Sequence, residues 1–270
     1  MTMKDSRSRF GFSSMPFTRK ISVNQMFTLP QHAEVVRALV DAVTSRASAA
    51  LIAPAGLGKT AALRAVTDAL PGSRFRVRYT AVTGLSKRDM CKEIALTMGL
   101  AAAGAYNALV HKIQQAARAE MDTDAVRPVL IIDDAHELRP DVLSMLRVIT
   151  NFQMDSRLVL SLVLAGQPPL AEMLRKPEHE DIARRLVHYA VLGPLSRDEV
   201  QQYVTHRCAV AGSARVPFDE SSLDAIFEVG RGNLRATDLI AYKSLDVAHR
   251  RDRDTVDATC VVEARRHLWP

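Results

Sequence analysis

An apolar strand in this sequence runs into a glycine-rich turn and then into a helix. Residues 51–63 read Leu-Ile-Ala-Pro-Ala-Gly-Leu-Gly-Lys-Thr-Ala-Ala-Leu. The turn at 53–60 matches the phosphate-loop pattern G-x-x-x-x-G-K-S/T except at its first position, where Ala53 replaces glycine. Because this loop requires a strand before it and a helix after it, the segment predicts an α/β fold that binds a nucleoside triphosphate.

Each residue type in the turn has a chemical role in this interpretation. Gly56 and Gly58 stand where a side chain would keep backbone N–H groups from closing around phosphate oxygens. Lys59 supplies a positive charge for the β- and γ-phosphates, and Thr60 is expected to ligate Mg²⁺ at a helix N-terminus, whose dipole favours the anion. A turn with a capping threonine is the simpler alternative. The predicted nucleotide-binding residues are Pro54, Ala55, Gly56, Leu57, Gly58, Lys59, Thr60 and Ala61.

A second segment, residues 129–134, reads Val-Leu-Ile-Ile-Asp-Asp, a buried-type strand that ends in two carboxylates. Beside a phosphate loop, we expect Asp133 to hold Mg²⁺ through water and Asp134 to orient or deprotonate the attacking water. The usual second acid in such proteins is glutamate, which is one methylene longer. We therefore expect slow hydrolysis, or assistance from Glu137. A solvated turn after a core strand would look the same in isolation.

Composition sets the frame for these motifs. A chain of 270 residues with 47% hydrophobic residues can bury a sizeable core. No apolar run approaches the roughly 20 residues of a membrane span. The three cysteines, Cys91, Cys208 and Cys260, lack metal-ligand spacing and are odd in number, which favours reduced thiols and a cytoplasmic location.

The net charge of +6 favours an anionic partner, and nucleic acid is the leading macromolecular candidate. For any single group of cations, a solvated surface is the competing explanation. The basic residues concentrate at Arg7–Arg9, Arg19–Lys20, Arg74–Arg78, Lys87–Arg88, Arg184–Arg185 and His249–Arg253.

Strands and helices alternate after the phosphate loop, which predicts a parallel sheet. The expected elements are a helix to about residue 70, a strand at 75–82, a helix from Ser86 to Met98, a helix at 106–120, a strand at 129–132, a helix at 140–150, and strands at 158–165 and 187–192.

Beyond Pro194 the strand pattern stops. Ser196 and Glu199 have capping-box spacing, and helices are expected at 200–211, 220–229, 234–247 and 255–267. We therefore predict an α/β nucleotide-binding domain with an N-terminal extension at residues 1–193, followed by a small all-helical lid domain at residues 194–270.

With these motifs in place, the chain resembles AAA+ ATPases of the ExeA/TniB type, a group that includes transposition ATPases and relatives of the phage Mu B protein. The resemblance covers nearly the whole chain. It implies a three-layer AAA+ fold with a parallel sheet. The matching segments are residues 10–12, 15–17, the phosphate loop, 130–138, 146–155, 164–170, 194–196 and 232–235.

The resemblance implies further site residues. Gln167 falls where the family places a polar sensor of the γ-phosphate, although it also suits a turn. Arg185 falls where an arginine finger reaches the neighbouring subunit's nucleotide, with Arg184 as its adjacent competitor and an ordinary ion pair as the alternative. Arg235 resembles the sensor arginine of the lid, and the segment 21–30 is expected to lie against adenine.

The function that the resemblance implies is an ATP- and Mg²⁺-dependent ATPase that self-assembles into a ring or filament, binds duplex DNA without sequence preference and helps a transposase. Lys87, Arg88 and Lys112 are the expected phosphate contacts, though a solvated helix face explains them equally well. Two alternatives stay open: a secretion ATPase like ExeA, and a scaffold that uses nucleotide as a switch.

Overall fold

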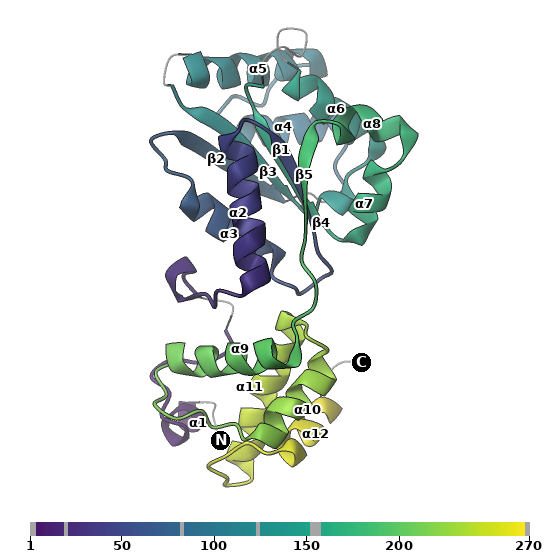
Figure 1. Ribbon diagram of the computed structural model, residues 1–270. Coiled ribbons are helices and arrows are strands. Elements are labelled where there is room, and N and C mark those ends of the chain that lie inside the picture. Colours follow the sequence, from purple (N-terminus) through teal and green to yellow (C-terminus); the bar gives the residue numbers. More distant parts are fainter. Residues whose placement is uncertain (1–3, 19–20, 82–83, 123–124, 152–157, 268–270) are drawn as a thin grey trace. The chain divides into compact units, whose positions relative to one another are not determined.

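A computed structural model describes residues 4–18, 21–81, 84–122, 125–151 and 158–267 of the chain (Figure 1). The chain divides into two compact units. One consists of Pro30–Ala55 and Lys59–Leu192, and the other of Met1–Leu29, Gly56–Gly58 and Gly193–Pro270. We refer to them as the α/β unit and the helical unit.

The α/β unit is built on a five-stranded sheet in the order β2-β3-β4-β1-β5. Every strand pair is parallel, so the carboxyl ends of the strands share one edge. The register sets Ala81 beside Asp133 in the β2–β3 pair and Ile52 beside Gly166 in the β1–β4 pair. The strands are β1 (Ser48–Ile52), β2 (Phe75–Ala81), β3 (Arg127–Asp133), β4 (Ser161–Gly166) and β5 (Leu186–Val191).

Helices cover both faces of this sheet (Figure 1). The predicted three-layer α/β fold with a parallel sheet is confirmed. Alternate residues of the central strands, such as Leu130 and Ile132 on β3, belong to the core that α4, α5 and α6 close. The helices of the unit are α2 (Pro30–Thr44), α3 (Lys59–Ala69), α4 (Lys87–Thr97), α5 (Tyr106–Asp122), η2 (Ala135–Glu137), α6 (Pro140–Thr150), α7 (Pro168–Leu174), η3 (Pro177–His179) and α8 (Glu180–Ala183).

Several boundaries differ from the sequence-based expectations. The strand expected at 158–165 begins only at Ser161, and its closing Pro168 starts α7, because proline is well suited to the first turn of a helix. Helix α2 was not expected at all. Val82, at the end of the expected second strand, and residues 152–155 of the matching segment 146–155 lie outside the described residues.

The helical unit contains α9 (Arg197–Val210), α10 (Glu220–Gly230), α11 (Leu234–Arg250) and α12 (Ala258–Arg266). The predicted capping box is present at the start of α9: the backbone N–H of Glu199 donates to Ser196 Oγ at 3.3 Å, and that of Ser196 donates to Glu199 Oε2 at 2.8 Å. A buried polar cluster joins α9 to α11, where Arg207 and Tyr203 both donate to the carboxylate of Asp238. Burial raises the pKa of Asp238 to about 6.

The N-terminal segment packs with the helical unit instead of extending the α/β domain. It includes α1 (Lys4–Arg9) and η1 (Val23–Gln25). Phe10, Phe12 and Phe17 are buried in the core of the helical unit, which explains the grouping of Met1–Leu29 with Gly193–Pro270. A guanidinium N–H of Arg207 also donates to Thr18 O at 2.7 Å and so ties the segment to α9.

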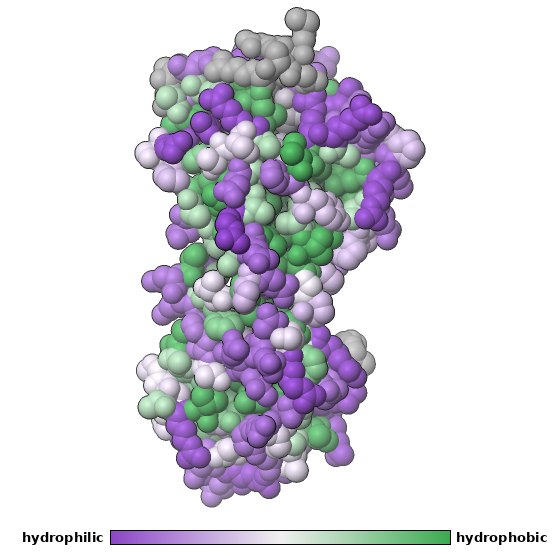
Figure 2. Space-filling model, in the orientation of Figure 1, coloured by the Kyte–Doolittle hydropathy of each residue, from purple (hydrophilic) through white to green (hydrophobic). Residues whose placement is uncertain are grey.

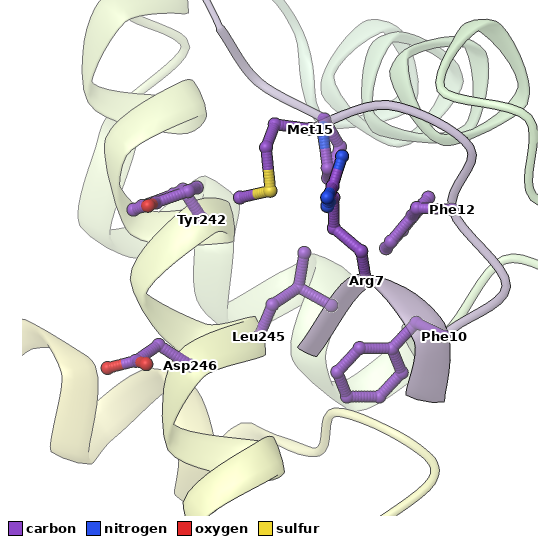
Figure 3. A pocket seen from close by; sticks show the side chains of 8 residues that line it. Arg7, Phe10, Phe12, Met15, Tyr242, Leu245 and Asp246 are labelled. Atoms are coloured by element: carbon purple, nitrogen blue, oxygen red, sulfur yellow. The ribbon is translucent and has the colours of Figure 1, made fainter. Parts of the chain in front are cut away.

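Figure 3 shows a small pocket between this segment and α11. Tyr242 and Leu245 of α11 face Phe10, Phe12 and Met15 across it. Arg7 and Asp246 supply its charged groups. The pocket is therefore a gap in the packing that holds the N-terminal segment to α11.

No helix among the described residues is both long enough and apolar enough to cross a membrane. In the view of Figure 2, hydrophobic residues form scattered patches among hydrophilic ones. Cys91, Cys208 and Cys260 are buried free thiols, and burial raises the pKa of each.

Candidate nucleotide-binding site

The phosphate loop follows β1 and leads into α3, as the sequence predicts. Gly56 and Gly58 have φ angles of +82° and +89°, a region that glycine reaches without a steric penalty. This backbone is the concave arrangement of N–H groups that suits a phosphate. Pro54 and Ala55 are exposed, whereas Leu57 is buried, so the loop is anchored at its middle and open around it.

Lys59 is the first residue of α3 and is only 8% exposed. Its Nζ donates to Ala53 O at 3.2 Å and so bridges the two ends of the loop. This contact places the ammonium group inside the turn, where a bound phosphate chain would need its charge.

Thr60 and Asp133 meet although they are far apart in sequence. Thr60 Oγ1 donates to Asp133 Oδ2 at 3.0 Å. Asp133 is 3% exposed, since it is the last residue of a strand that is buried from Pro128 onward. The structure therefore brings the two predicted magnesium ligands into direct contact at the carboxyl edge of the sheet.

Tyr79 on β2 is a member of the site that the sequence analysis did not identify. Its hydroxyl donates to Asp133 Oδ2 at 3.1 Å, the same oxygen that accepts from Thr60. Burial and the negative charge of Asp133 raise the pKa of Tyr79 to about 12, so its hydroxyl stays a donor at neutral pH. The only sequence signal was its place in the alternating strand next to β3.

Asp134, the predicted water-orienting acid, lies directly after β3. It is exposed and has a left-handed backbone with φ of +50°, which aspartate tolerates better than most residues. Its backbone N–H donates to Asp133 Oδ1 at 2.9 Å, so both oxygens of Asp133 are held. Glu137 is also exposed, and its Oε1 lies 3.5 Å from Nε2 of His136.

Gln167 follows β4, the strand between β1 and β3. Its Nε2 lies 2.7 Å from His136 Nε2, and because an amide nitrogen only donates, the imidazole accepts in this arrangement. Gly166 makes room for this pair, since a Cβ there would lie 3.0 Å from the backbone nitrogen of His136. The predicted sensor is thus held by a histidine that the sequence analysis did not single out, three residues after Asp133.

The two arginines before β5 have different surroundings. Arg184 pairs with Glu180 one turn earlier at 2.6 Å and is exposed. Arg185, the predicted arginine finger, donates from Nη1 to Thr150 O at 3.3 Å at the end of α6. The ion pair between Arg184 and Glu180 distinguishes the surroundings of Arg184 from those of Arg185.

Arg235 is the second residue of α11 and is exposed. Its backbone N–H donates to Gly56 O at 3.1 Å within the same compact unit. Asn233 caps the helix by accepting from the backbone N–H of Ala236 at 3.1 Å. The segment 21–29, expected against adenine, belongs to the helical unit, and Pro30 starts α2.

The three predicted DNA contacts gather around the loop between α4 and α5. Lys87 Nζ lies 4.7 Å from the ring centroid of Tyr106. Arg88 donates to the carbonyl of residue 104 at 3.3 Å, and Lys112 donates to that of residue 103 at 3.1 Å. All three are exposed, so each charge faces solvent while its side chain also supports the loop.

The residues present fit a magnesium nucleotide. The loop offers backbone N–H groups and an ammonium to phosphate, and Thr60 with Asp133 offers the hard oxygen ligands that Mg²⁺ prefers. Gly56 and Gly58 add no side chains to the loop, and a Cβ at Gly56 would clash with Asn233 Oδ1 at 2.4 Å.

Comparison with known proteins agrees with this geometry. Residues 42–174 match a family model described as an AAA domain. Over 247 residues the chain is 30% identical to General secretion pathway protein A of Aeromonas hydrophila. The aligned region covers 90% of this chain and 44% of that protein. The chain thus spans less than half the length of this relative.

Solved structures resemble the whole chain at low identity. Cdc6p from Pyrobaculum aerophilum matches with a TM-score of 0.73, and the match covers 93% of this chain and 70% of Cdc6p. The Aeropyrum pernix Orc1 protein in complex with DNA matches with a TM-score of 0.71, and the match covers 94% of this chain and 69% of Orc1. The RuvB Holliday junction branch migration motor of Thermotoga maritima has 0.65 over 93% and 73%. Each is 18% identical, so these likenesses establish the fold.

Proposed function

We propose that this protein, which has the AAA+ fold and whose residues 42–174 match a model of the AAA domain, hydrolyses ATP in the presence of Mg²⁺ and assembles on duplex DNA as a helper of transposition. The contact between Thr60 Oγ1 and Asp133 Oδ2 is the observation that carries the nucleotide part of this proposal. It joins two residues that are 73 positions apart in the sequence, which supports a shared role for them in holding Mg²⁺.

The chemistry of this chain would be positioning and electrostatic stabilisation. Lys59 and the loop N–H groups would bind the phosphates, and Thr60 and Asp133 would hold Mg²⁺, which would supply positive charge near the transferred phosphoryl group. Asp134 accepts a proton from or orients the attacking water. Gln167, held by His136, contacts the γ-phosphate or that water.

Two arginines would complete the site from outside the loop. Arg185 acts on the nucleotide of a neighbouring subunit, which makes hydrolysis dependent on assembly. Arg235 relates the position of the helical lid to the nucleotide state. ATP sandwiched between subunits explains why an arginine distant from its own phosphate loop would matter.

The DNA part of the proposal is supported by charge. The chain carries a net charge of +6, and Lys87, Arg88 and Lys112 present three exposed cations around one loop. Contacts of this type bind phosphates without reading sequence. Among the structures that share the fold, Orc1 is in complex with DNA and RuvB is described as a Holliday junction branch migration motor. The motif resemblance to transposition ATPases suggests the specific role.

A secretion role is the second candidate, and the 30% identity to General secretion pathway protein A favours it. A scaffold that binds ATP as a switch is the third, because Asp134 replaces the usual glutamate.

Binding to duplex DNA separates these candidates. We expect ATP, more than ADP, to promote assembly on several unrelated duplexes, with affinity that falls steeply as salt rises. Electron microscopy of the protein with ATP and DNA would show rings or filaments. An absence of DNA binding at low salt would reject the transposition role and favour secretion or scaffolding.

A further inference from the structure

Three arginines come together at the amino edge of the sheet, opposite the carboxyl edge that holds the nucleotide site. Arg46 precedes β1, Arg74 precedes β2 and Arg127 opens β3. The backbone N–H of Arg127 donates to Arg74 O at 2.9 Å, and its guanidinium donates to Thr44 O at 2.7 Å, two residues before Arg46. Segments from three parts of the chain thus meet at one place.

Packing fixes two of these guanidinium groups. Phe75 is 4% exposed, and its ring centroid lies 5.9 Å from Arg74 Cζ and 5.7 Å from Arg127 Cζ. Cation–π contacts of this kind hold a guanidinium in place without neutralising it. The charges are therefore arranged before any partner binds.

Among the described residues, none of these three arginines forms an ion pair with an acid. In the part of the chain that the structure describes, no carboxylate lies within 4.0 Å of Arg46, Arg74 or Arg127. Burial and the charges of Arg46 and Arg74 lower the pKa of Arg127. By contrast, Arg78, which is on β2, pairs with Glu120 of α5.

The end of helix α2 compensates only a small part of this charge. The carbonyl end of a helix carries about half a negative elementary charge, against three guanidinium groups here. Arg46 also has a left-handed backbone with φ of +60°. The N–H of Ala47 donates to Ala42 O and that of Arg46 to Val43 O, so Arg46 occupies the helix-ending position that glycine usually takes. The chain thus places a cation where glycine would be less strained.

We propose that Arg46, Arg74 and Arg127 form a binding site for the phosphate backbone of duplex DNA, separate from the surface formed by Lys87 and Arg88 of α4 and Lys112 of α5. The proposal rests on the proposed DNA-binding function and assigns it a second surface. A guanidinium is planar and donates two parallel hydrogen bonds, which suits phosphate oxygens, and duplex DNA repeats such groups along its length.

The test is the double variant Arg46→Gly and Arg74→Ala. Glycine suits the left-handed backbone at 46, and Arg74 is exposed, so the fold should persist. Each phosphate contact adds about 0.9 to the slope of log affinity against log salt, which is about eightfold in affinity at 0.1 M salt. Loss of two contacts should lower the slope by about 1.8 and weaken binding about 60-fold, equally on unrelated duplexes.

A matched control is available in the helical unit. Arg231 also has a left-handed backbone, with φ of +50°, but pairs with Glu228 at 3.4 Å, and the exposed Arg250 pairs with Asp246 at 3.4 Å. The variant Arg231→Gly and Arg250→Ala also removes two positive charges. Its salt slope should nevertheless equal that of the wild type within experimental error. ATP affinity and thermal unfolding should be unchanged in both variants.

The outcomes distinguish this inference from the function on which it rests. If the wild-type protein binds DNA and the Arg46/Arg74 variant keeps the full salt slope, the site is overturned while the DNA-binding function stands. If the wild-type protein does not bind DNA, both are overturned. Loss of binding to phosphatidylglycerol vesicles with intact DNA binding would also overturn the proposal, since the ligand would then be a lipid headgroup.

Discussion

Removal of a single hydroxyl tests how the magnesium ligands are oriented. Tyr79→Phe deletes the donor that lies 3.1 Å from Asp133 Oδ2 and leaves the contacts of Asp133 with Thr60 and with the Asp134 N–H. A hydrogen bond to a charged group is worth about 1.5–3 kcal/mol, and the lower figure applies because Tyr79 is 47% exposed. A loss of about 1.4 kcal/mol corresponds to a tenfold change in affinity, which agrees with the effect of losing a group that orients a metal ligand.

We therefore expect Tyr79→Phe to raise about tenfold the Mg²⁺ concentration needed for half-maximal binding of a fluorescent ATP analogue. Binding of the same analogue with EDTA present should not change, because Tyr79 has no contact with the phosphate loop among the hydrogen bonds of the described residues. Tyr189→Phe is the control, since Tyr189 is 51% exposed on β5. An unchanged Mg²⁺ titration in Tyr79→Phe would refute the idea that this hydroxyl positions Asp133.

Three further predictions concern other buried or strained groups. Lys59→Ala should lose ATP binding and keep its circular dichroism spectrum; wild-type affinity would reject the phosphate loop. Asp134→Asn should bind ATP normally but hydrolyse it far more slowly, since asparagine also tolerates the left-handed backbone; wild-type turnover would exclude Asp134 as the water-orienting group. The native pKa of Asp238, about 6, lies above its ordinary 3.8, so the native state binds the extra proton between these values. The unfolding free energy of the wild type relative to Asp238→Asn should therefore fall as pH rises through 6, by up to about 3 kcal/mol in urea unfolding; a difference independent of pH would contradict this assignment.

The candidate nucleotide site could be located from the sequence because its motifs are contiguous and chemically specific. Gly56, Gly58, Lys59 and Thr60 each have a role that few other residues could fill, and the order of apolar and charged residues before Asp133 fixes where that strand ends. Each of these features is defined by residues that are adjacent in the sequence. The sequence therefore contains the information locally.

The contacts that the sequence did not reveal depend on register between strands. Tyr79 reaches Asp133 because Ala81 pairs with Asp133 across β2 and β3, and no local pattern states that register. His136 meets Gln167 only because β4 ends beside the turn after β3.

The ion-pair partners of charged residues could not be predicted from the sequence either. The sequence contains Arg74, Arg76 and Arg78 as one basic run, but only the fold shows that Glu120 pairs with Arg78 while no described carboxylate pairs with Arg74. Likewise, the three phenylalanines near the N-terminus look like part of an extension until their burial in the helical unit is seen.

The two charged edges of the sheet are too far apart to influence each other directly. From Arg127 to Asp133, β3 spans six residue steps, which is about 20 Å, whereas the Debye length at physiological salt is about 8 Å. The charge of a bound nucleotide therefore has little effect on DNA held at the amino edge of the same subunit. For DNA held at this edge, a dependence of affinity on ATP must then arise from assembly, which raises the number of linked DNA contacts. Arg185→Ala, if it blocks assembly, should consequently bind short duplexes with equal affinity in ATP and in ADP, whereas Arg184→Ala should retain the preference for ATP. A preference for ATP in monomeric Arg185→Ala, measured by fluorescence anisotropy and sedimentation, would show that the two edges communicate within one subunit.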